Sequence, residues 1–330
     1  MDPSTFEAIP SPAPRPPRGH FTLAPEENIF ESLVVDLTHR CNMTCANCYL
    51  PNRTIPDLDV DRLYDMLARL PRRTYIRLIG AEPTLRTDLP DIIRQVIKLG
   101  HKPSLTTNGL KLGRLDYCRQ LADAGLRYVL ISMNGADDDD VYRLLDNGKY
   151  ATLKTRALTN AFRCGFMTDT GSIIAKGLNE RTIRRQIEIV VACAQKVGID
   201  FRTSLPWARI SPVLRIKSIG KIGRYMEGRS YSLSELTALA MDAADIEPDH
   251  APSQSIASGL NYIRLKDDGP TNSTLLPVQT PLGRIFIRVI DWSIDDGGVP
   301  DAGNRHRGRL TEDFRIAPFF EDVKANEFGY

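Results

Sequence analysis

The sequence predicts an α/β fold built on a parallel sheet, and two observations support this. From about residue 30 to residue 205, short apolar segments alternate with amphipathic segments of helical period. A glycine ends most of the amphipathic segments, where a left-handed C-terminal cap is expected. Six strand–helix units imply parallel strands joined by right-handed crossovers. The pattern alone does not distinguish an open sheet from a barrel.

The predicted elements follow one another in a regular order. The strands are Ser32–Leu37, Tyr75–Gly80, a strand ending at Thr106, Tyr128–Ser132, Thr168–Ala175 and Asp200–Ser204. Between them, apolar residues spaced three and four apart predict helices that pack one face on the sheet. The glycines that end these helices are Gly100, Gly125, Gly165 and Gly198.

The chain divides into three predicted parts. Residues 1–28 are rich in Pro, Ser and Ala and predict a disordered tail rather than a signal peptide. Residues 29–208 form the strand–helix core. Residues 209–330 break the rhythm and predict a small C-terminal α+β lobe that binds or caps the substrate. Its expected elements are a helix at Leu233–Ala244 and strands at Tyr262–Leu265 and Arg284–Trp292.

Composition excludes several classes of partner. The chain has 330 residues, a net charge of +2 and no long basic run, so no nucleic-acid or membrane partner is expected. No segment approaches the length of a transmembrane helix. We therefore expect a cytoplasmic protein, in which cysteines are more often ligands or core residues than disulfides.

Three of the six cysteines fall within eight residues, directly after the first predicted strand. Cys41, Cys45 and Cys48 have the spacing Cys-x3-Cys-x2-Cys, which chance would produce about 0.002 times in such a chain. Three thiolates can hold three irons of a 4Fe–4S cluster and leave the fourth iron open. A structural zinc site that includes His39 is the alternative, although its closeness to Cys41 limits its reach to the same metal.

Polar and glycine-containing segments also follow the next four strands. Because the carboxyl ends of parallel strands meet at one edge of a sheet, we expect these segments to lie together and bind a ligand. They are Gly80-Ala81-Glu82-Pro83-Thr84, Thr106–Gly109, Ser132–Gly135 and Lys176–Glu180.

The cysteine motif, followed by the aromatic Tyr49, resembles that of the radical S-adenosylmethionine (SAM) superfamily, in particular the branch with molybdenum-cofactor and peptide-modifying enzymes. The resemblance covers about residues 30–205 and implies a partial parallel (β/α)6 barrel. It implies one 4Fe–4S cluster on Cys41, Cys45 and Cys48, with SAM as second cofactor. A one-electron donor such as flavodoxin or ferredoxin would reduce the cluster, and a 5′-deoxyadenosyl radical would abstract hydrogen from the substrate.

The resemblance also implies the residues that bind SAM. Gly80, Ala81 and Glu82 match a Gly-Gly-Glu-Pro motif that receives the methionyl ammonium, with Ala81 in place of the second glycine. The other expected contacts of SAM are Asn108, Ser132, Asn134, Lys176 and Tyr49. Asn108 and Asn134 equally suit roles in shaping turns, and packing explains Tyr49 as well as adenine binding does.

We expect a radical SAM enzyme that acts on a small biosynthetic intermediate such as a sugar or nucleoside. One alternative is a protein-directed radical SAM enzyme, either a glycyl-radical activase or a peptide modifier. The other is a non-catalytic zinc-binding scaffold. Several arginines in or near the lobe either bind a phosphate or carboxylate of the substrate or, more commonly, lie scattered on the surface. They are Arg202, Arg209, Arg215, Arg264, Arg284 and Arg288.

Overall fold

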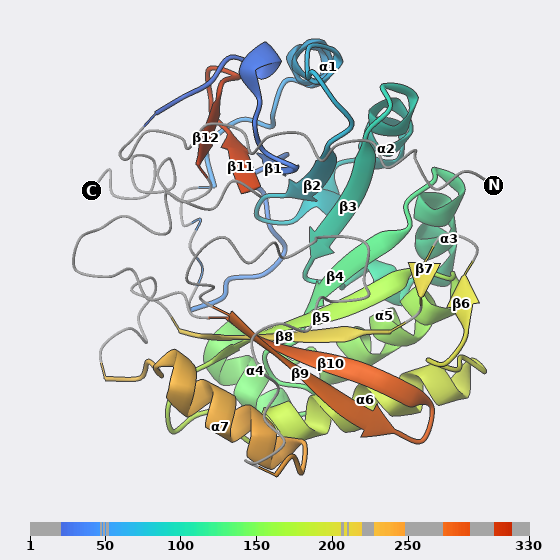
Figure 1. The fold of residues 1–330 in the computed structure, drawn as a ribbon, viewed down its shortest axis with the longest axis vertical. Coiled ribbons are helices and arrows are strands. Elements are labelled where there is room, and N and C mark those ends of the chain that lie inside the picture. The colour runs from blue at the N-terminus through green and yellow to red at the C-terminus, as the bar shows by residue number, and fades with distance from the viewer. Residues whose placement is uncertain are drawn as a thin grey trace, which may run out of the picture.

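The computed structural model describes residues 21–46, 48, 50, 53–205, 208–209, 211–219, 228–247, 273–290 and 307–318. One curved, open sheet dominates these residues (Figure 1), with the strand order β12-β11-β1-β2-β3-β4-β5-β8-β10-β9. Only the edge pairs β11–β12 and β9–β10 are antiparallel, so the predicted α/β fold with a partial, unclosed barrel is confirmed. The strands are β1 (Ser32–Asp36), β2 (Tyr75–Ile79), β3 (Lys102–Thr107), β4 (Tyr128–Ser132), β5 (Met167–Ile174), β8 (Val213–Ser218), β9 (Ser273–Thr280), β10 (Gly283–Ile290), β11 (Arg307–Leu310) and β12 (Ile316–Pro318).

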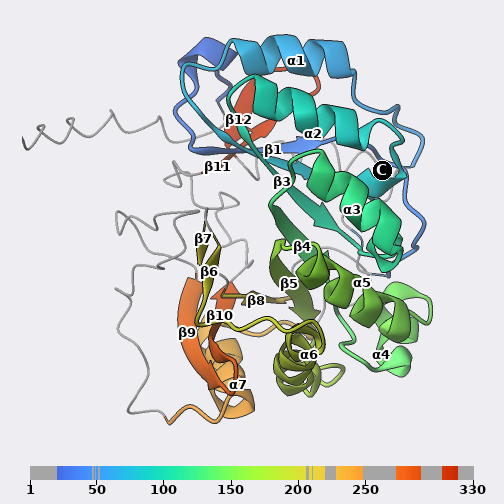
Figure 2. The ribbon, with the colours of Figure 1, turned by 90° about the vertical axis from the view of Figure 1, so that its right-hand side faces the viewer.

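The crossover helices lie along one face of the sheet, as Figure 2 shows. Two helices follow β4 where the sequence predicted one, because Asn147 adopts a left-handed conformation and ends the first of them. The helices are α1 (Val60–Ala68), α2 (Leu89–Lys98), α3 (Leu115–Asp123), α4 (Asp139–Asp146), α5 (Ala151–Arg163), α6 (Thr182–Lys196) and α7 (Leu233–Ala243), with short 3-10 turns η1 (Pro25–Glu27), η2 (Pro83–Leu85) and η3 (Lys111–Gly113). No helix in these stretches of chain has the length and apolar character needed to cross a membrane.

The hydrophobic core lies between the helices and the sheet. Successive side chains of a strand point to opposite faces, and one set is fully buried, for example Leu33 and Val35 of β1 and Ile76 and Leu78 of β2. The alternate positions place polar and charged side chains, such as Arg77, on the concave face away from the helices. The face away from the helices is therefore mixed, because it carries Arg77 of β2 and also the buried Val34 of β1.

The prediction of a sixth strand at Asp200–Ser204 is wrong. The carboxylate of Asp200 accepts a hydrogen bond from the backbone N–H of Arg202 at 2.8 Å, and such a local bond favours a turn over a strand. The short strands β6 (Ser204–Leu205) and β7 (Ala208–Arg209) then pair only with each other. The sixth parallel strand is β8, which pairs with β5.

Strands from the predicted C-terminal lobe extend both ends of the sheet. β8 and β10 continue it beyond β5, whereas β11 pairs with β1 at the other end. The main sheet therefore continues beyond the predicted boundary at residue 208. The predicted strand Tyr262–Leu265 and most of the predicted tail lie outside the described residues, but Leu23 forms a bridge with Ile316 of β12.

Gly80 brings the end of β2 against the chain that leaves β1. Its φ is +129°, and a Cβ there would lie 2.4 Å from the carbonyl oxygen of Thr38. Beyond this contact, Ala81 N donates to Thr38 O at 2.8 Å, and Glu82 N donates to Arg40 O at 3.0 Å. Only glycine fits this close approach of two backbones.

We expect Gly80→Ala to lower the free energy of unfolding by about 3 kcal/mol, because it combines a strained φ with a collision against backbone. Gly100→Ala is the matched control. Gly100 has a φ of +89° but open space around a Cβ, so its cost should be about 1 kcal/mol. Denaturant unfolding measures both, and equal losses would contradict the role given to the Thr38 contact.

Candidate functional site

The cysteine-bearing loop connects β1 to α1, at the carboxyl edge of the sheet. Cys41, Cys45 and Cys48 are half-buried. The backbone N–H of Met43 lies 3.4 Å from Cys41 Sγ, and Arg53 Nη2 lies 3.1 Å from Cys48 Sγ. N–H groups directed at sulfur favour the thiolate form that binds iron.

Burial raises the pKa values of Cys41 and Cys45, and metal binding requires that these thiols lose their protons. Across the described ranges, no three His, Cys, Asp or Glu side chains already stand close enough together to hold one metal ion. The donor set, three cysteines on one loop, fits a cluster with one open iron. Their role as iron ligands remains a prediction.

The carboxylate of Glu82 is fully buried and organises the turn after β2. Its Oε1 accepts hydrogen bonds from Thr84 N at 3.0 Å, Thr84 Oγ1 at 2.5 Å and Thr107 Oγ1 at 2.7 Å. Its Oε2 accepts one from Asn108 N at 2.7 Å. Four donors fix this carboxylate, and Oε2 retains more acceptor capacity than Oε1.

Asn108 joins the Glu82 turn to the cysteine loop. Its Nδ2 donates to Asn42 Oδ1 at 2.8 Å and lies 3.9 Å from Cys41 Sγ. Its backbone N–H binds Glu82. The structure therefore brings together four predicted site residues, Cys41, Glu82, Asn108 and Gly80, from the ends of β1, β2 and β3.

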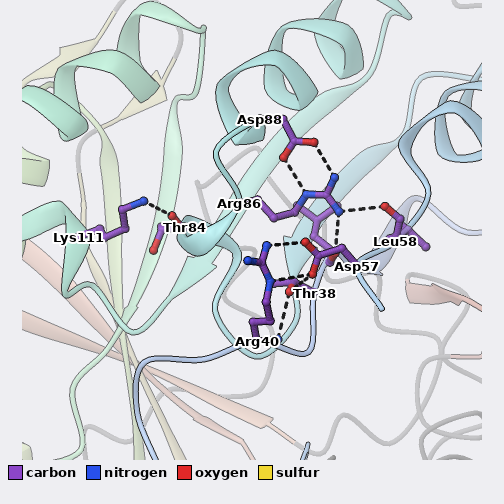
Figure 3. Close-up of polar contacts among 9 residues, drawn as sticks. Thr38, Arg40, Asp57, Leu58, Thr84, Arg86, Asp88 and Lys111 are labelled. Carbon is purple, nitrogen blue, oxygen red and sulfur yellow. Dashed lines mark hydrogen bonds and ion pairs between the residues drawn. The ribbon is translucent and has the colours of Figure 1, made fainter. Parts of the chain in front are cut away.

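Arg86 holds the two ends of the cysteine loop against each other (Figure 3). Its Nη1 donates to Leu37 O at 3.1 Å and to Leu58 O at 2.9 Å, while Leu58 N donates to Leu37 O at 3.0 Å. The other side of the guanidinium forms two bonds to Asp88, at 2.8 and 2.6 Å. These bonds hold the pKa of Asp88 below its usual range. Sequence reasoning missed Arg86, because Leu37 and Leu58 are distant from it along the chain.

A second set of hydrogen bonds holds the two ends of the same loop together. Asp57, just before Leu58, accepts from Thr38 Oγ1 at 2.5 Å and from Arg40 Nε at 3.1 Å and Nη2 at 2.5 Å. Both partners lie at the start of the loop. The first and last residues of the loop are therefore held side by side, as Figure 3 shows. The cysteines between them are thereby confined to the edge of the sheet.

Lys154 of α5 is a further residue that the sequence did not single out. It is fully buried, and its Nζ donates to Ser132 O at 2.7 Å and to Asn108 O at 3.0 Å. Burial lowers its pKa, whereas the charges of Asp146 and Cys45 raise it. Lys154 thus fixes the ends of β3 and β4.

The sequence did contain a signal for Lys154. It lies three, four and seven residues before Ala157, Leu158 and Ala161, all fully buried. A lysine at a core position of a helix needs polar partners when buried, so its place in this pattern predicts an internal role.

Asn134 lies at the end of β4 and is engaged within the protein. Its Nδ2 donates to Asp146 Oδ1 at 2.9 Å, and its Oδ1 accepts from Ile173 N at 3.0 Å. It therefore ties β4 to β5 and to the buried Asp146, as expected for the turn-shaping role. Contact with SAM by Asn134 or by Ser132, whose backbone oxygen binds Lys154, remains a prediction.

Lys176 lies apart from the cysteine loop's contacts. It is half-exposed and forms an ion pair with Glu235 of α7 at 3.4 Å. Glu180 nearby accepts from Tyr231 Oη at 2.5 Å. The structure thus joins this strand end to α7. Its predicted SAM contact is untested, and Tyr49 lies outside the described residues.

The comparisons with known proteins agree with this geometry. Residues 35–188 match the family model described as the Radical SAM superfamily. A 7,8-dihydro-6-hydroxymethylpterin dimethyltransferase of Methanocaldococcus jannaschii is 28% identical over 180 residues, covering 51% of this chain and 35% of that protein. A probable GTP 3′,8-cyclase of Sulfolobus acidocaldarius is 41% identical over 113 residues, covering 32% and 35%. A GTP 3′,8-cyclase of Rhodopseudomonas palustris is 26% identical over 263 residues, covering 74% and 69%.

Among solved structures, Streptococcus suis SuiB bound to precursor peptide SuiA has a TM-score of 0.51 at 17% identity. The match covers 66% of this chain and 46% of that one, and it shows a shared fold alone. The chain spans about a third of the length of the first two curated relatives.

We expect Arg86→Gln to weaken retention of iron by about tenfold, because supports behind metal ligands commonly contribute that much. Arg94→Gln is the matched control, since Arg94 pairs only with Asp91 on the exposed surface of α2 among the contacts described. Iron per chain after reconstitution and desalting, together with the rate of thiol alkylation, measures the effect. Equal iron contents and alkylation rates in the two variants would show that Arg86 does not position the loop.

Proposed function

Residues 35–188 match the model of the Radical SAM superfamily, and we propose that this chain is a radical SAM enzyme that reductively cleaves SAM and abstracts hydrogen from a small biosynthetic intermediate. Members of this superfamily use a 4Fe–4S cluster and SAM. The observation that carries the proposal is the joining of the Cys-x3-Cys-x2-Cys loop to the buried Glu82 turn. Two named activities among the relatives, a pterin dimethyltransferase and a GTP cyclase, support a small-molecule substrate.

In this proposal, Cys41, Cys45 and Cys48 hold three irons of the cluster. When bound, the reduced cluster and SAM together supply a 5′-deoxyadenosyl radical. Glu82, with the backbone carbonyl groups beside it, accepts hydrogen bonds from the methionyl ammonium. Because Thr84, Thr107 and Asn108 already fix the carboxylate, it is oriented before SAM arrives.

The remaining groups keep the site rigid. Lys154 is buried and bound to two carbonyl oxygens at the ends of neighbouring strands, so it fixes the floor of the site. Arg86 and Asp57 hold the loop closed at its base. In this proposal, a one-electron donor such as flavodoxin or ferredoxin reduces the cluster.

The direct test is anaerobic reconstitution with iron and sulfide, followed by incubation with SAM and dithionite. We expect about four irons per chain and formation of 5′-deoxyadenosine, with both lost in Cys45→Ala. Cys164→Ala, at the end of α5 and outside the loop, is the matched control and should retain both. A chain that binds one zinc and leaves SAM intact would instead establish the zinc-scaffold alternative.

A further inference from the structure

Arg53 places a cation directly against one of the three cysteines of the loop. It lies five residues after Cys48, on the stretch of chain that leads to α1. Its Nη2 donates to Cys48 Sγ at 3.1 Å, and its Nη1 donates to His39 O at 3.3 Å. One guanidinium group therefore connects the first residues of the loop to the last of the three cysteines.

Arg53 differs from the two arginines that hold the base of the loop. Arg40 bonds to the carboxylate of Asp57, and Arg86 bonds to that of Asp88, so a negative charge lies directly against each of these guanidinium groups. In the described part of the chain, the bonds of Arg53 go instead to a sulfur atom and a carbonyl oxygen. Its positive charge is therefore directed at a cysteine rather than at a carboxylate.

The sulfur of Cys48 lies between a donor and an acceptor. It accepts from Arg53 Nη2, and its own thiol donates to Leu50 O at 3.5 Å. A thiol must lose its proton to bind iron, and its bond to Leu50 O is lost with that proton. The guanidinium keeps its protons, so the bond from Arg53 is the one that a thiolate can retain. A negative charge on the acceptor strengthens such a bond.

The charge of Arg53 also reaches a second cysteine. Burial is the main cause of the raised pKa of Cys41, and the positive charge of Arg53 is among the influences that oppose it. The guanidinium group is thus within electrostatic range of two of the three cysteines, and it contacts one of them directly. It can therefore act on the charge that the whole loop holds.

Hydrogen bonds to the ligand sulfurs and nearby charges are among the factors that set the reduction potential of an iron–sulfur cluster. Reduction adds one negative charge to the cluster and its thiolates. A cation or an N–H donor beside a sulfur therefore stabilises the reduced form more than the oxidised form. Arg53 supplies both, and the two effects favour reduction.

We propose that Arg53 raises the reduction potential of the cluster through its bond to Cys48. This inference rests on the proposed function, and it assigns a residue to the first step, the transfer of one electron from the donor. The donor loses one electron and the cluster gains it, while the guanidinium keeps its protons. Because Arg53 acts through Cys48, it is a positioning residue, and its effect is on how readily the donor reduces the cluster.

The midpoint potential of the reconstituted full-length chain tests this inference. A redox titration without SAM, followed by electron paramagnetic resonance of the reduced cluster, measures this potential. We expect Arg53→Gln to lower the equilibrium constant for one-electron reduction about tenfold, which corresponds to a fall of about 59 mV. Arg53→Lys keeps the charge and should show a smaller fall. Arg94→Gln removes a charge from the exposed surface of α2 and is the matched control, with an unchanged potential.

A purely structural role of Arg53 would give a different result. Loss of a support for the loop would lower the iron content of Arg53→Gln, but the clusters that remain would have the potential of the unaltered chain. The midpoint potential is a property of each cluster and does not depend on how many chains carry one. Equal potentials in Arg53→Gln and Arg94→Gln would therefore overturn the inference, whatever their iron contents.

Cobalt(II) gives a second readout in case Arg53→Gln assembles no cluster. Thiolate-bound cobalt(II) absorbs light by transfer of charge from sulfur to metal, and a hydrogen bond to the sulfur raises the energy of this transition. We expect the absorption band of Arg53→Gln to lie at longer wavelength than the bands of Arg94→Gln and the unaltered chain. Identical bands in all three would then overturn the inference.

Failure of this inference and failure of the proposed function give different patterns. SAM cleavage with equal potentials in Arg53→Gln and Arg94→Gln would overturn the role of Arg53 alone. A cluster whose potential depends on Arg53, in a chain that leaves SAM intact, would refute the proposed function and support the role of Arg53. An unaltered chain that assembles no cluster would overturn both.

Discussion

The close approach of Gly80 to Thr38 sets the geometry on which the candidate site depends. With no side chain at Gly80, the end of β2 lies directly against the chain leaving β1, and two further backbone hydrogen bonds continue the contact to Glu82. The loop with the three cysteines and the turn with the buried carboxylate are thereby held in one fixed relation. Arg86 and Asp57 then close the loop at its base. The proposed iron ligands and the proposed acceptor of the SAM ammonium group would otherwise lie on two independently mobile segments.

Behind this contact, buried polar groups support the edge of the sheet. Lys154 binds the carbonyl oxygens that end β3 and β4, and Asn134 bonds to Asp146 and to β5. Buried polar groups are costly unless satisfied, so each of these contacts restricts the strand ends to a single arrangement. The bonds of Lys154 and Asn134 therefore restrain this edge of the sheet.

Local signals in the sequence predicted much of the fold. Alternating strands and helices, with glycine caps such as Gly100 and Gly125, are confirmed because strand and helix periodicity reflects which side chains face the core. The cysteine spacing placed the candidate site directly after β1. In contrast, the sixth strand was misplaced, because the local bonds of Asp200 form a turn that hydrophobicity does not reveal. The pairing of β11 with β1 joins segments about 275 residues apart in register, and no local pattern encodes such a pairing.

The candidate site was predictable where a motif specifies it and unpredictable where tertiary contacts do. Glu82 and Asn108 lie together as expected. Arg86 was missed because the carbonyl oxygens it binds, those of Leu37 and Leu58, are distant along the chain. Lys154 was missed although its place among the buried residues of α5 is a local signal.

Mössbauer spectroscopy of the chain reconstituted with iron-57, recorded with and without SAM, tests the central claim most directly. If three cysteines leave one iron of a 4Fe–4S cluster open to SAM, addition of SAM should change the signal of about a quarter of the iron and leave the rest unaltered. A spectrum that SAM does not change, or iron that never assembles into a four-iron cluster, would contradict the account.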